Sequence, residues 1–579
     1  MSISQGVAVH LSYDKKSDRI AYASNRSIFV RSVEKPEECV QYVNHTTATT
    51  VAKFAPSGFY VASGDEHGNV KVWDVAGEDM VTKGEYQVIS GRINDLEWDA
   101  DSQRIIAVGD GKERYGHCFT ADSGNTVGEI SGHTEVVNAV SIRPVRPYRA
   151  ATVSDDSNMV FYQGPPFKFN FTSRGNHSNF INDVRFSPDG AYIVTVGADK
   201  NICLYDGKTG EFQAKVECDH DGGIFAVAWS PDSSKFATSS ADGSVKLWDV
   251  NEKKLLKTWK LEKSIPNQQV GVVFAGDNRI ISLTFNGDLH YYNISSDEPE
   301  RVVKGHQKNI TGLSYLNGTL YSGSYDSSLL HWKNSTASPI KGDSHSSVIA
   351  GVATSNGKVW SVGWDNNIKC ICGDSFCKSV PLEAQPKAIQ STTNGSTVAV
   401  MSEDFVELFK DGEKTNSKKF DFVPTAFGVS DNLIAIGTPE NQIQLYKHDL
   451  DGPVDTLPQL RANASYLSFS PNGELLAAGD AAGKITLYKV SDKSVQTTRW
   501  AFHNSRVTSI NWHESGKYVV TGSVDTNIFV YSVEKPAKNI KFMGAHIDGV
   551  NSVIWDSPES IVSAGADATI KHWKVTFHQ

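Results

Sequence analysis

The sequence predicts an all-β protein built from about fourteen copies of one short antiparallel unit. The clearest copy covers residues 224–249, where three runs of alternating apolar residues are separated by turn residues such as Asp242-Gly243. Trp, Tyr and Phe make up 10% of the 579 residues, which is consistent with many short strands.

The last strand of this copy, which ends in Trp248-Asp249, recurs along the whole chain. Successive copies are roughly 37 to 46 residues apart, the period of a four-stranded propeller blade. Strong copies lie at residues 70–74, 202–206, 329–332 and 570–573. Weaker copies end near Phe29, Phe119, Phe161, Tyr291, Ile371, Leu408, Tyr446, Tyr488 and Val530. On these repeats the sequence resembles the WD-repeat family over nearly its whole length.

The number of copies predicts how many propellers the chain forms. Seven blades make a common closed ring, whereas fourteen blades in one ring would leave a wide hole. We therefore expect two seven-bladed β-propellers, residues 1–296 and 297–579, joined at the polar segment 293–300.

The strands that close the rings are harder to place. In WD-repeat propellers an outermost strand from the chain start usually closes the last blade, but here residues 1–5 precede the first inner strand, 7–11. We expect either a very short closing strand or a chain that begins late, and a weakened edge at that blade. Residues 301–304 are expected to lie beside residues 571–575 as the outer strand of the last blade.

Composition excludes several classes of function. The net charge is −10, and a general nucleic-acid binder would instead need a basic face to neutralise phosphates. No run of 18 apolar residues is present, so we expect no membrane span.

The seven cysteines are odd in number, irregularly spaced and not preceded by a signal peptide, which favours reduced thiols in the cytosol or nucleus. One cluster, Cys370, Cys372 and Cys377, lacks the fourth ligand and the usual spacing of a zinc site. We expect buried strand cysteines there, and no metal.

Histidine and aspartate recur in the repeats in a pattern that on paper resembles a catalytic pair. His306 and Asp326 have counterparts in His546 and Asp567. A catalytic site occurs once, whereas a structural device occurs in each unit, so we expect the pairs to be structural. The chain also lacks a phosphate-binding P-loop, a zincin motif and sialidase-type boxes. We expect no enzyme and no cofactor.

Function on a repeat scaffold is expected where the pattern is broken, and three such places lie between residues 110 and 182. The first is the long charged loop 110–117. The second is Gly164–Phe171, in which Phe167, Phe169 and Phe171 alternate and are expected to share one face of an extended segment. Two hypotheses account for the three phenylalanines: they pack inside the blade, or they form an exposed aromatic anchor for a partner protein. The third is the loop tip at Phe180, beside the turn that holds Asp155-Asp156 in the preceding unit. Loops between strands reach a common rim in a propeller, so these places can form one surface.

These segments carry a sharper resemblance. Gly164-Pro165-Pro166-Phe167-Lys168-Phe169, the loop Lys112–His117, residues 141–147 and the ending 565–571 are similar to the actin-interacting protein 1 family, most of all to its fungal members. The resemblance implies two seven-bladed propellers in a clamshell arrangement, with a binding surface on the first propeller. It implies that the surface uses Glu113, Asp155, Phe169 and Phe180, with Lys112 and Arg114 flanking the first of these.

The same resemblance implies the function. The family binds actin filaments decorated with cofilin (ADF/cofilin) and promotes their severing and disassembly without being an enzyme. We expect a cytoplasmic monomer on the actin cytoskeleton, in cortical actin patches if the chain is fungal, with neither nucleic acid nor membrane as partner. A WD-repeat scaffold or adaptor of another complex, such as a ubiquitin-ligase or translation scaffold, is the alternative.

Overall fold

The computed structural model describes residues 8–77 and 79–577, in which all the regular structure is β-strand. The strands form thirteen four-stranded sheets and one three-stranded sheet, and strands that are consecutive in the chain are neighbours in each sheet. The predicted all-β fold with about fourteen repeated sheets is confirmed. The described residues contain no helix that is long and apolar enough to cross a membrane.

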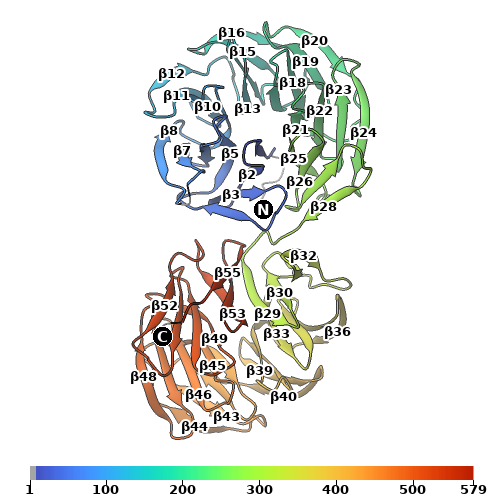
Figure 1. Cartoon of the computed structure of the whole chain (residues 1–579). Helices are drawn as coiled ribbons and strands as arrows, with labels where there is room; N and C mark the ends of the chain where they lie inside the picture. The colour runs from blue at the N-terminus through green and yellow to red at the C-terminus, as the bar shows by residue number, and fades with distance from the viewer. Residues whose placement is uncertain (1–7, 78, 578–579) are drawn as a thin grey trace. The chain divides into compact units, whose positions relative to one another are not determined.

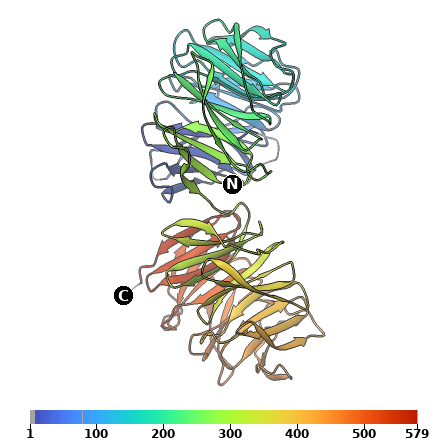
Figure 2. The same ribbon diagram turned by 90° about the vertical axis from the view of Figure 1, so that its right-hand side faces the viewer.

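The first compact unit extends from Met1 to Gly305. Its seven sheets follow one another around a ring (Figure 1, blue to green), and Figure 2 shows the same strands turned by 90°. In order, the sheets comprise β1 (Ser12–Asp14), β2 (Arg19–Ser24), β3 (Ser27–Ser32) and β4 (Cys39–Tyr42); β5 (Thr49–Phe54), β6 (Tyr60–Asp65), β7 (Asn69–Asp74) and β8 (Thr82–Gln87); β9 (Ile93–Trp98), β10 (Arg104–Gly109), β11 (Gly116–Thr120) and β12 (Thr126–Glu129); β13 (Val137–Ile142), β14 (Arg149–Ser154), β15 (Met159–Gln163) and β16 (Lys168–Ser173); β17 (Ile181–Phe186), β18 (Tyr192–Gly197), β19 (Ile202–Asp206) and β20 (Phe212–Val216); β21 (Ile224–Trp229), β22 (Lys235–Ser240), β23 (Ser244–Asp249) and β24 (Lys254–Lys260); β25 (Gln269–Phe274), β26 (Arg279–Thr284), β27 (Leu289–Asn293) and β28 (Pro299–Val303).

The second unit extends from His306 to Gln579 and holds the other seven sheets. They comprise β29 (Ile310–Leu316), β30 (Thr319–Ser324), β31 (Leu329–Lys333) and β32 (Thr336–Pro339); β33 (Ile349–Ser355), β34 (Lys358–Gly363), β35 (Asn367–Cys372) and β36 (Ser375–Pro381); β37 (Pro386–Ser391), β38 (Val398–Ser402), β39 (Phe405–Lys410) and β40 (Glu413–Lys419); β41 (Ala426–Val429), β42 (Ile434–Gly437), β43 (Ile443–Tyr446) and β44 (Pro453–Leu457); β45 (Ala464–Phe469), β46 (Leu475–Asp480), β47 (Ile485–Lys489) and β48 (Ser494–Trp500); β49 (Val507–Trp512), β50 (Tyr518–Ser523), β51 (Ile528–Ser532) and β52 (Asn539–Phe542); β53 (Val550–Ser557), β54 (Ser560–Gly565) and β55 (Ile570–Lys574).

Contacts between the first and last sheets close each ring. In the first unit, Tyr22 of β2 and Val270 of β25 belong to one buried apolar cluster. In the second unit, the side-chain amide of Asn551 on β53 donates a hydrogen bond to the Ile310 carbonyl on β29 at 2.8 Å. Each unit is therefore a seven-bladed β-propeller.

One predicted strand pairing is wrong. Residues 301–304 were expected beside residues 571–575, but β28 pairs with β27, with Arg301 opposite Tyr291. The short polar segment after β27 turns the chain straight back along that strand, and a short connection between neighbouring strands is the usual topology. The boundary between the units lies between Gly305 and His306, later than the expected joint after residue 296.

The last sheet of the second unit, β53 to β55, has three strands in the part of the chain that the structure describes. Residues 1–5, the expected closing strand, and Val7 at the start of the expected first inner strand lie outside the described residues.

A hydrogen-bonded relay of four side chains ties the strands within a blade together. In the sixth sheet, Trp248 Nε1 donates to Thr238 Oγ1 at 2.9 Å. His220 lies 2.9 Å from the same hydroxyl through Nε2 and 2.9 Å from Asp242 Oδ2 through Nδ1. Burial alone would raise the pKa of Asp242, but the hydrogen bonds from His220 and Ser244 hold this pKa well below its usual value.

The same His–Asp contact recurs in other blades, as expected of a structural device. The pairs at this position of a blade are His45–Asp65, His133–Asp156, His177–Asp199, His220–Asp242, His306–Asp326, His345–Asp365, His503–Asp525 and His546–Asp567. All eight histidine side chains are buried and hydrogen-bonded inside a blade, so we interpret the pairs as contacts that hold the strands of each blade together.

Candidate protein-interaction site

The predicted site residues come from loops at one end of the first unit. In a four-stranded meander, the turn between the second and third strands and the connection to the next sheet emerge at the same end. Glu113 lies in the β10–β11 turn, Asp155 in the β14–β15 turn and Phe180 in the β16–β17 connection. Three residues far apart in sequence therefore share one rim.

Glu113 lies at the tip of a rigidly closed loop. The Gly109 amide donates to the Tyr115 carbonyl at 2.8 Å, which closes the base of the loop. A Cβ atom on Gly111 would lie 1.8 Å from the Arg114 carbonyl oxygen, so the tight turn requires glycine there. Lys112, Glu113 and Arg114 are all exposed at the tip.

The guanidinium of Arg114 lies 3.1 Å from the Glu129 carboxylate on β12. Both side chains are more than half exposed, so this ion pair contributes little to stability. It does keep Arg114 beside β12, whereas no ion pair with another described residue orients the Lys112 side chain toward the sheet. We therefore place Lys112 and Arg114 at the edge of the site.

Hydrogen bonds link the charged loop to the next blade. Tyr115 Oη donates to the Thr134 carbonyl at 3.2 Å, in the connection between β12 and β13. The Thr134 amide in turn donates to Asp156 Oδ2 at 3.1 Å, in the turn that also holds Asp155. The positions of Glu113 and Asp155 are thus coupled through protein contacts.

The side-chain amide of Asn138 links Asp155 to Ile181, the residue that follows Phe180. The Asn138 side-chain nitrogen donates to Asp155 Oδ1 at 2.8 Å and to the Ile181 carbonyl at 3.0 Å. Phe180, directly before Ile181, accepts a hydrogen bond from the Ala198 amide at 2.8 Å through its carbonyl. Its backbone is fixed, yet its side chain is 51% exposed.

Phe169 reaches the same region from the outer strand β16. Its side chain is 48% exposed, and one edge of the ring lies against Gly132 in the β12–β13 connection. A Cβ atom on Gly132 would lie 2.7 Å from the Phe169 ring. The glycine therefore admits the ring beside the loop that holds Thr134.

The expectation that Phe167, Phe169 and Phe171 share one face is wrong. Phe167 lies in the turn before β16 and is buried in the cluster that contains Tyr162. Phe171 packs against Phe161 in a different cluster, with ring centroids 5.7 Å apart. A β-bulge between the pairs Phe161–Phe171 and Tyr162–Phe169 breaks the alternation, and Phe169 alone of the three is exposed.

Glu113, Asp155, Phe169 and Phe180 are hereafter the first-unit patch. It combines two half-exposed aromatic rings with two carboxylates, on loops that hydrogen bonds between side chains and backbone link together. Large apolar groups at such positions are typical anchors of protein interfaces. Tyr115, Thr134 and Asn138, which hold the patch together, were not singled out from the sequence.

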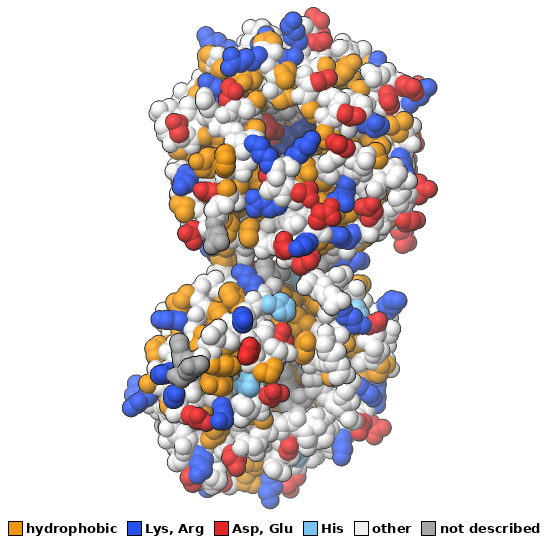
Figure 3. Space-filling model, viewed as in Figure 1, with side chains coloured by type: hydrophobic (Ala, Val, Ile, Leu, Met, Phe, Trp, Pro, Cys, Tyr) orange, Lys and Arg blue, Asp and Glu red, His pale blue; other side chains and the backbone are white. Residues whose placement is uncertain are grey.

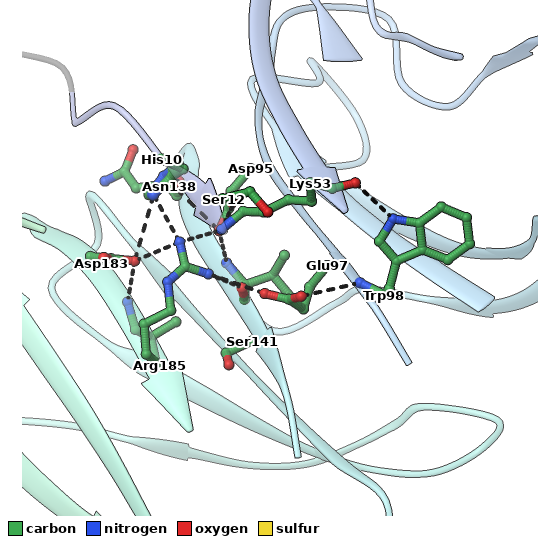
Figure 4. A network of polar contacts seen from close by, with 12 residues as sticks. His10, Ser12, Lys53, Asp95, Glu97, Trp98, Asn138, Ser141, Asp183 and Arg185 are labelled. Carbon is green, nitrogen blue, oxygen red and sulfur yellow. Dashed lines mark hydrogen bonds and ion pairs between the residues drawn. The ribbon is translucent and has the colours of Figure 1, made fainter. Parts of the chain in front are cut away.

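A second group of polar side chains lies inside the first unit, around its central channel. Figure 3 shows a hollow at the centre of this unit with acidic and basic side chains in it. In Figure 4 the Arg185 guanidinium points between His10, Asp95 and Asp183. Its Nη2 atom lies 2.8 Å from His10 Nδ1 and 3.0 Å from each carboxylate.

These distances decide whether the group is a metal site. The ligand atoms of His10, Asp95 and Asp183 lie within 4.8 Å of one another, as metal ligands would. The Arg185 guanidinium already occupies the space between them and supplies the positive charge. Burial lowers the pKa of His10, so the ring is neutral and accepts a hydrogen bond from Arg185. We interpret the group as a buried structural network.

The cysteine cluster differs from its expectation. Cys372 and Cys377 are joined by a disulfide and are both exposed, whereas Cys370 is free and buried. The prediction of reduced, buried cysteines is thus wrong for the exposed pair. A β-bulge between Cys370 and Ile371 leaves Cys377 without a direct partner on β35 and brings it within reach of Cys372.

Comparison with family models places WD repeats on both units. The model for "WD domain, G-beta repeat" matches residues 37–74, 168–206, 212–249 and 297–333. The model for "Anaphase-promoting complex subunit 4 WD40 domain" matches residues 467–558.

Comparison with curated proteins finds relatives over almost the whole chain. An uncharacterized WD repeat-containing protein of Schizosaccharomyces pombe is 42% identical, covering 97% of this chain and 96% of the relative. The proteins named actin-interacting protein 1 in Drosophila melanogaster and in Caenorhabditis elegans are each 34% identical. Each of these two alignments covers 99% of this chain, with 96% of the fly protein and 97% of the worm protein.

Proposed function

The chain belongs to the actin-interacting protein 1 family of WD-repeat proteins, and from this membership we propose that it binds actin filaments decorated with cofilin and promotes their severing and disassembly. The observation that carries the proposal is the first-unit patch, which combines two half-exposed phenylalanines with the exposed Glu113 and with Asp155, whose carboxylate Asn138 holds in place. We assign the patch to cofilin–actin recognition, with Lys112 and Arg114 at its edge.

The chemistry of the patch supports a protein partner. Phe169 and Phe180 would insert into apolar pockets of the partner, because truncating such anchors typically removes a large part of an interface's binding energy. Glu113 and Asp155 would face basic groups of the partner and so fix the orientation of binding. The hydrogen bonds through Tyr115, Thr134 and Asn138 hold the surface in place before binding, which lowers the entropy lost on association.

Filament disassembly requires no covalent chemistry in this account. A rigid protein surface that binds the cofilin-distorted filament better than the bare filament shifts the population toward the distorted form. The extent of the shift is set by the difference between the two affinities. We therefore propose a binding protein rather than an enzyme, acting as a cytoplasmic monomer on the actin cytoskeleton.

Co-sedimentation tests this proposal. The full chain is pelleted with bare actin filaments and with filaments saturated with cofilin, at equal actin concentration. We expect weak binding to the bare filaments and strong binding to the decorated ones. Equal pelleting with both filament types would contradict the cofilin-dependent function, and no pelleting with either would favour a scaffold of another complex.

A further inference from the structure

The hairpin of β35 and β36 in the second unit carries a chemical site that the actin-related function does not use. Cys372 ends β35, Cys377 lies on β36, and their sulfurs form a disulfide with the Cα atoms 5.8 Å apart. Both residues are exposed, so small molecules in solution can reach the two sulfurs.

The residues between these cysteines contact the preceding sheet. The Lys341 amide donates to the Asp374 carbonyl at 2.9 Å, and the Phe376 amide donates to the Lys341 carbonyl at 2.9 Å. Lys341 and Ser375 thereby form a parallel bridge, the one isolated bridge outside the strands among the described residues. The hairpin tip, residues 373–376, is thus hydrogen-bonded to the chain that follows β32.

Side chains reinforce this contact. Asp374 Oδ1 lies 3.1 Å from His331 Nδ1 and 3.4 Å from Lys333 Nζ, both on β31. Phe376 packs against the buried cluster that contains Tyr321 and Ile349, between the two sheets. The disulfide therefore closes a short covalent ring around the hairpin tip, through which this blade contacts the preceding one.

We propose that Cys372 and Cys377 are a thiol–disulfide exchange site for small disulfides of the glutathione class, and that their disulfide holds the hairpin tip against the preceding sheet. In the forward reaction, the thiolate of one cysteine attacks a sulfur of glutathione disulfide. The disulfide bond of glutathione breaks, one glutathione leaves as a thiolate that takes up a proton, and a mixed disulfide forms.

The thiolate of the second cysteine then attacks the protein sulfur of the mixed disulfide and releases the second glutathione. Two cysteine thiols and one glutathione disulfide thus become one protein disulfide and two glutathione thiols. Two electrons pass from the cysteines to glutathione, and excess reduced glutathione reverses both steps.

The three buried cysteines lack the access that this reaction needs. Cys370 lies next to the pair in sequence, but it is buried and burial raises the pKa of its thiol. Cys118 and Cys203 are also buried, and burial raises the pKa of each to about 12. Cys39 and Cys218 are half-buried, and burial raises the pKa of Cys218 to about 11. Exchange should therefore be faster at the exposed Cys372 and Cys377 than at the other cysteines, and the buried Cys370 provides a control close to the pair.

Differential alkylation of the full chain tests the site. The protein is equilibrated in glutathione buffers from fully reduced to fully oxidised, free thiols are blocked with one isotopic label, and disulfides are then reduced and labelled with a second. Peptide mass spectrometry should show Cys372 and Cys377 acquiring the second label together. Cys370→Ser should keep this behaviour, whereas Cys372→Ser should abolish it at Cys377.

Hydrogen exchange tests the structural consequence in the same samples. The Lys341 and Phe376 amides should exchange about tenfold faster or more after reduction, because opening the ring frees the hairpin tip. The proposal would be overturned by free thiols at both positions in oxidised glutathione, by pairing with Cys370, or by amide exchange that is independent of redox state. Protection of the thiols that a chelator rather than a reductant removes would instead identify a metal site and would also overturn it.

Discussion

Replacing Phe180 with alanine should weaken filament binding without unfolding the protein. The side chain is 51% exposed, so about half of its surface is already in water in the free protein. A fully buried Phe→Ala change costs about 3–5 kcal/mol, and we expect about 1 kcal/mol or less at this half-exposed position. If the ring is an interface anchor, its loss should cost about 2 kcal/mol of binding free energy, roughly a thirtyfold lower affinity.

The chain offers a control for this experiment. Phe212 on β20 is 42% exposed and belongs to the next blade, outside the first-unit patch. Phe180→Ala, Phe169→Ala and Phe212→Ala are compared by co-sedimentation with cofilin-decorated filaments and by circular dichroism melts. The first two should lose affinity and the third should not, with small changes in melting temperature for all three. Equal loss of affinity in all three variants, or loss that follows a large drop in melting temperature, would refute the assignment of the patch.

Two further predictions separate the scaffold from the patch. Trp248→Ala should lower the free energy of unfolding by about 3–5 kcal/mol, because it removes a buried ring and its hydrogen bond to Thr238. Glu113→Ala should change the free energy of unfolding by no more than about 0.5 kcal/mol. Denaturant unfolding measures both variants, and similar losses of stability would contradict the separation of scaffold from patch. The blades should also lose stability in acid, because the folded pKa of Asp242 lies below its unfolded value of 3.8 and that of Asp567 is lowered to about 2. The stabilisation that these two aspartates contribute is present above their unfolded pKa and is lost as pH falls from about 4 toward 2. Asp242→Asn should therefore flatten the pH dependence of the free energy of unfolding in this window. An unchanged slope would show that the His–Asp relay does not stabilise the folded state.

Most of the fold was predictable from the sequence because each blade repeats the same local signals. Alternating apolar residues and turns such as Asp242-Gly243 mark the strands, and the fourteen sheets occur where these signals recur. The pairing of β28 was less predictable, because an exposed outer strand carries little pattern to distinguish one sheet edge from another. Connection length decided it, and the strand pairs with the neighbouring β27.

The candidate site was predictable in part. The unusual loop at Glu113 and the loop-tip Phe180 stand out from the repeats, and both residues are exposed in the structure. The orientation of Phe169 depends on a β-bulge that the sequence does not mark, so its separation from Phe167 and Phe171 was missed. The contacts of Asn138 and the buried position of His10 depend on long-range packing, and no local pattern predicts them.

The patch also explains why neighbouring residues differ in their expected importance. Asp155 and Asp156 are adjacent, but Asp156 bonds to His133 within the blade, and this contact lowers the pKa of Asp156 against the opposing effect of burial. Asp155 instead bonds to Asn138 at the rim. Changes at Asp156 should therefore act through folding, whereas changes at Asp155 should act through binding.

Single-filament microscopy tests the central claim most directly. Fluorescent actin filaments, bare or decorated with cofilin, are exposed to the wild-type chain and to a variant in which Glu113, Asp155, Phe169 and Phe180 are all replaced by alanine. We predict rapid severing and disassembly with cofilin and wild-type protein, little effect on bare filaments, and strongly reduced disassembly by the folded variant. Full disassembly by that variant would contradict the role of the first-unit patch, and wild-type activity that is independent of cofilin would contradict the proposed function itself.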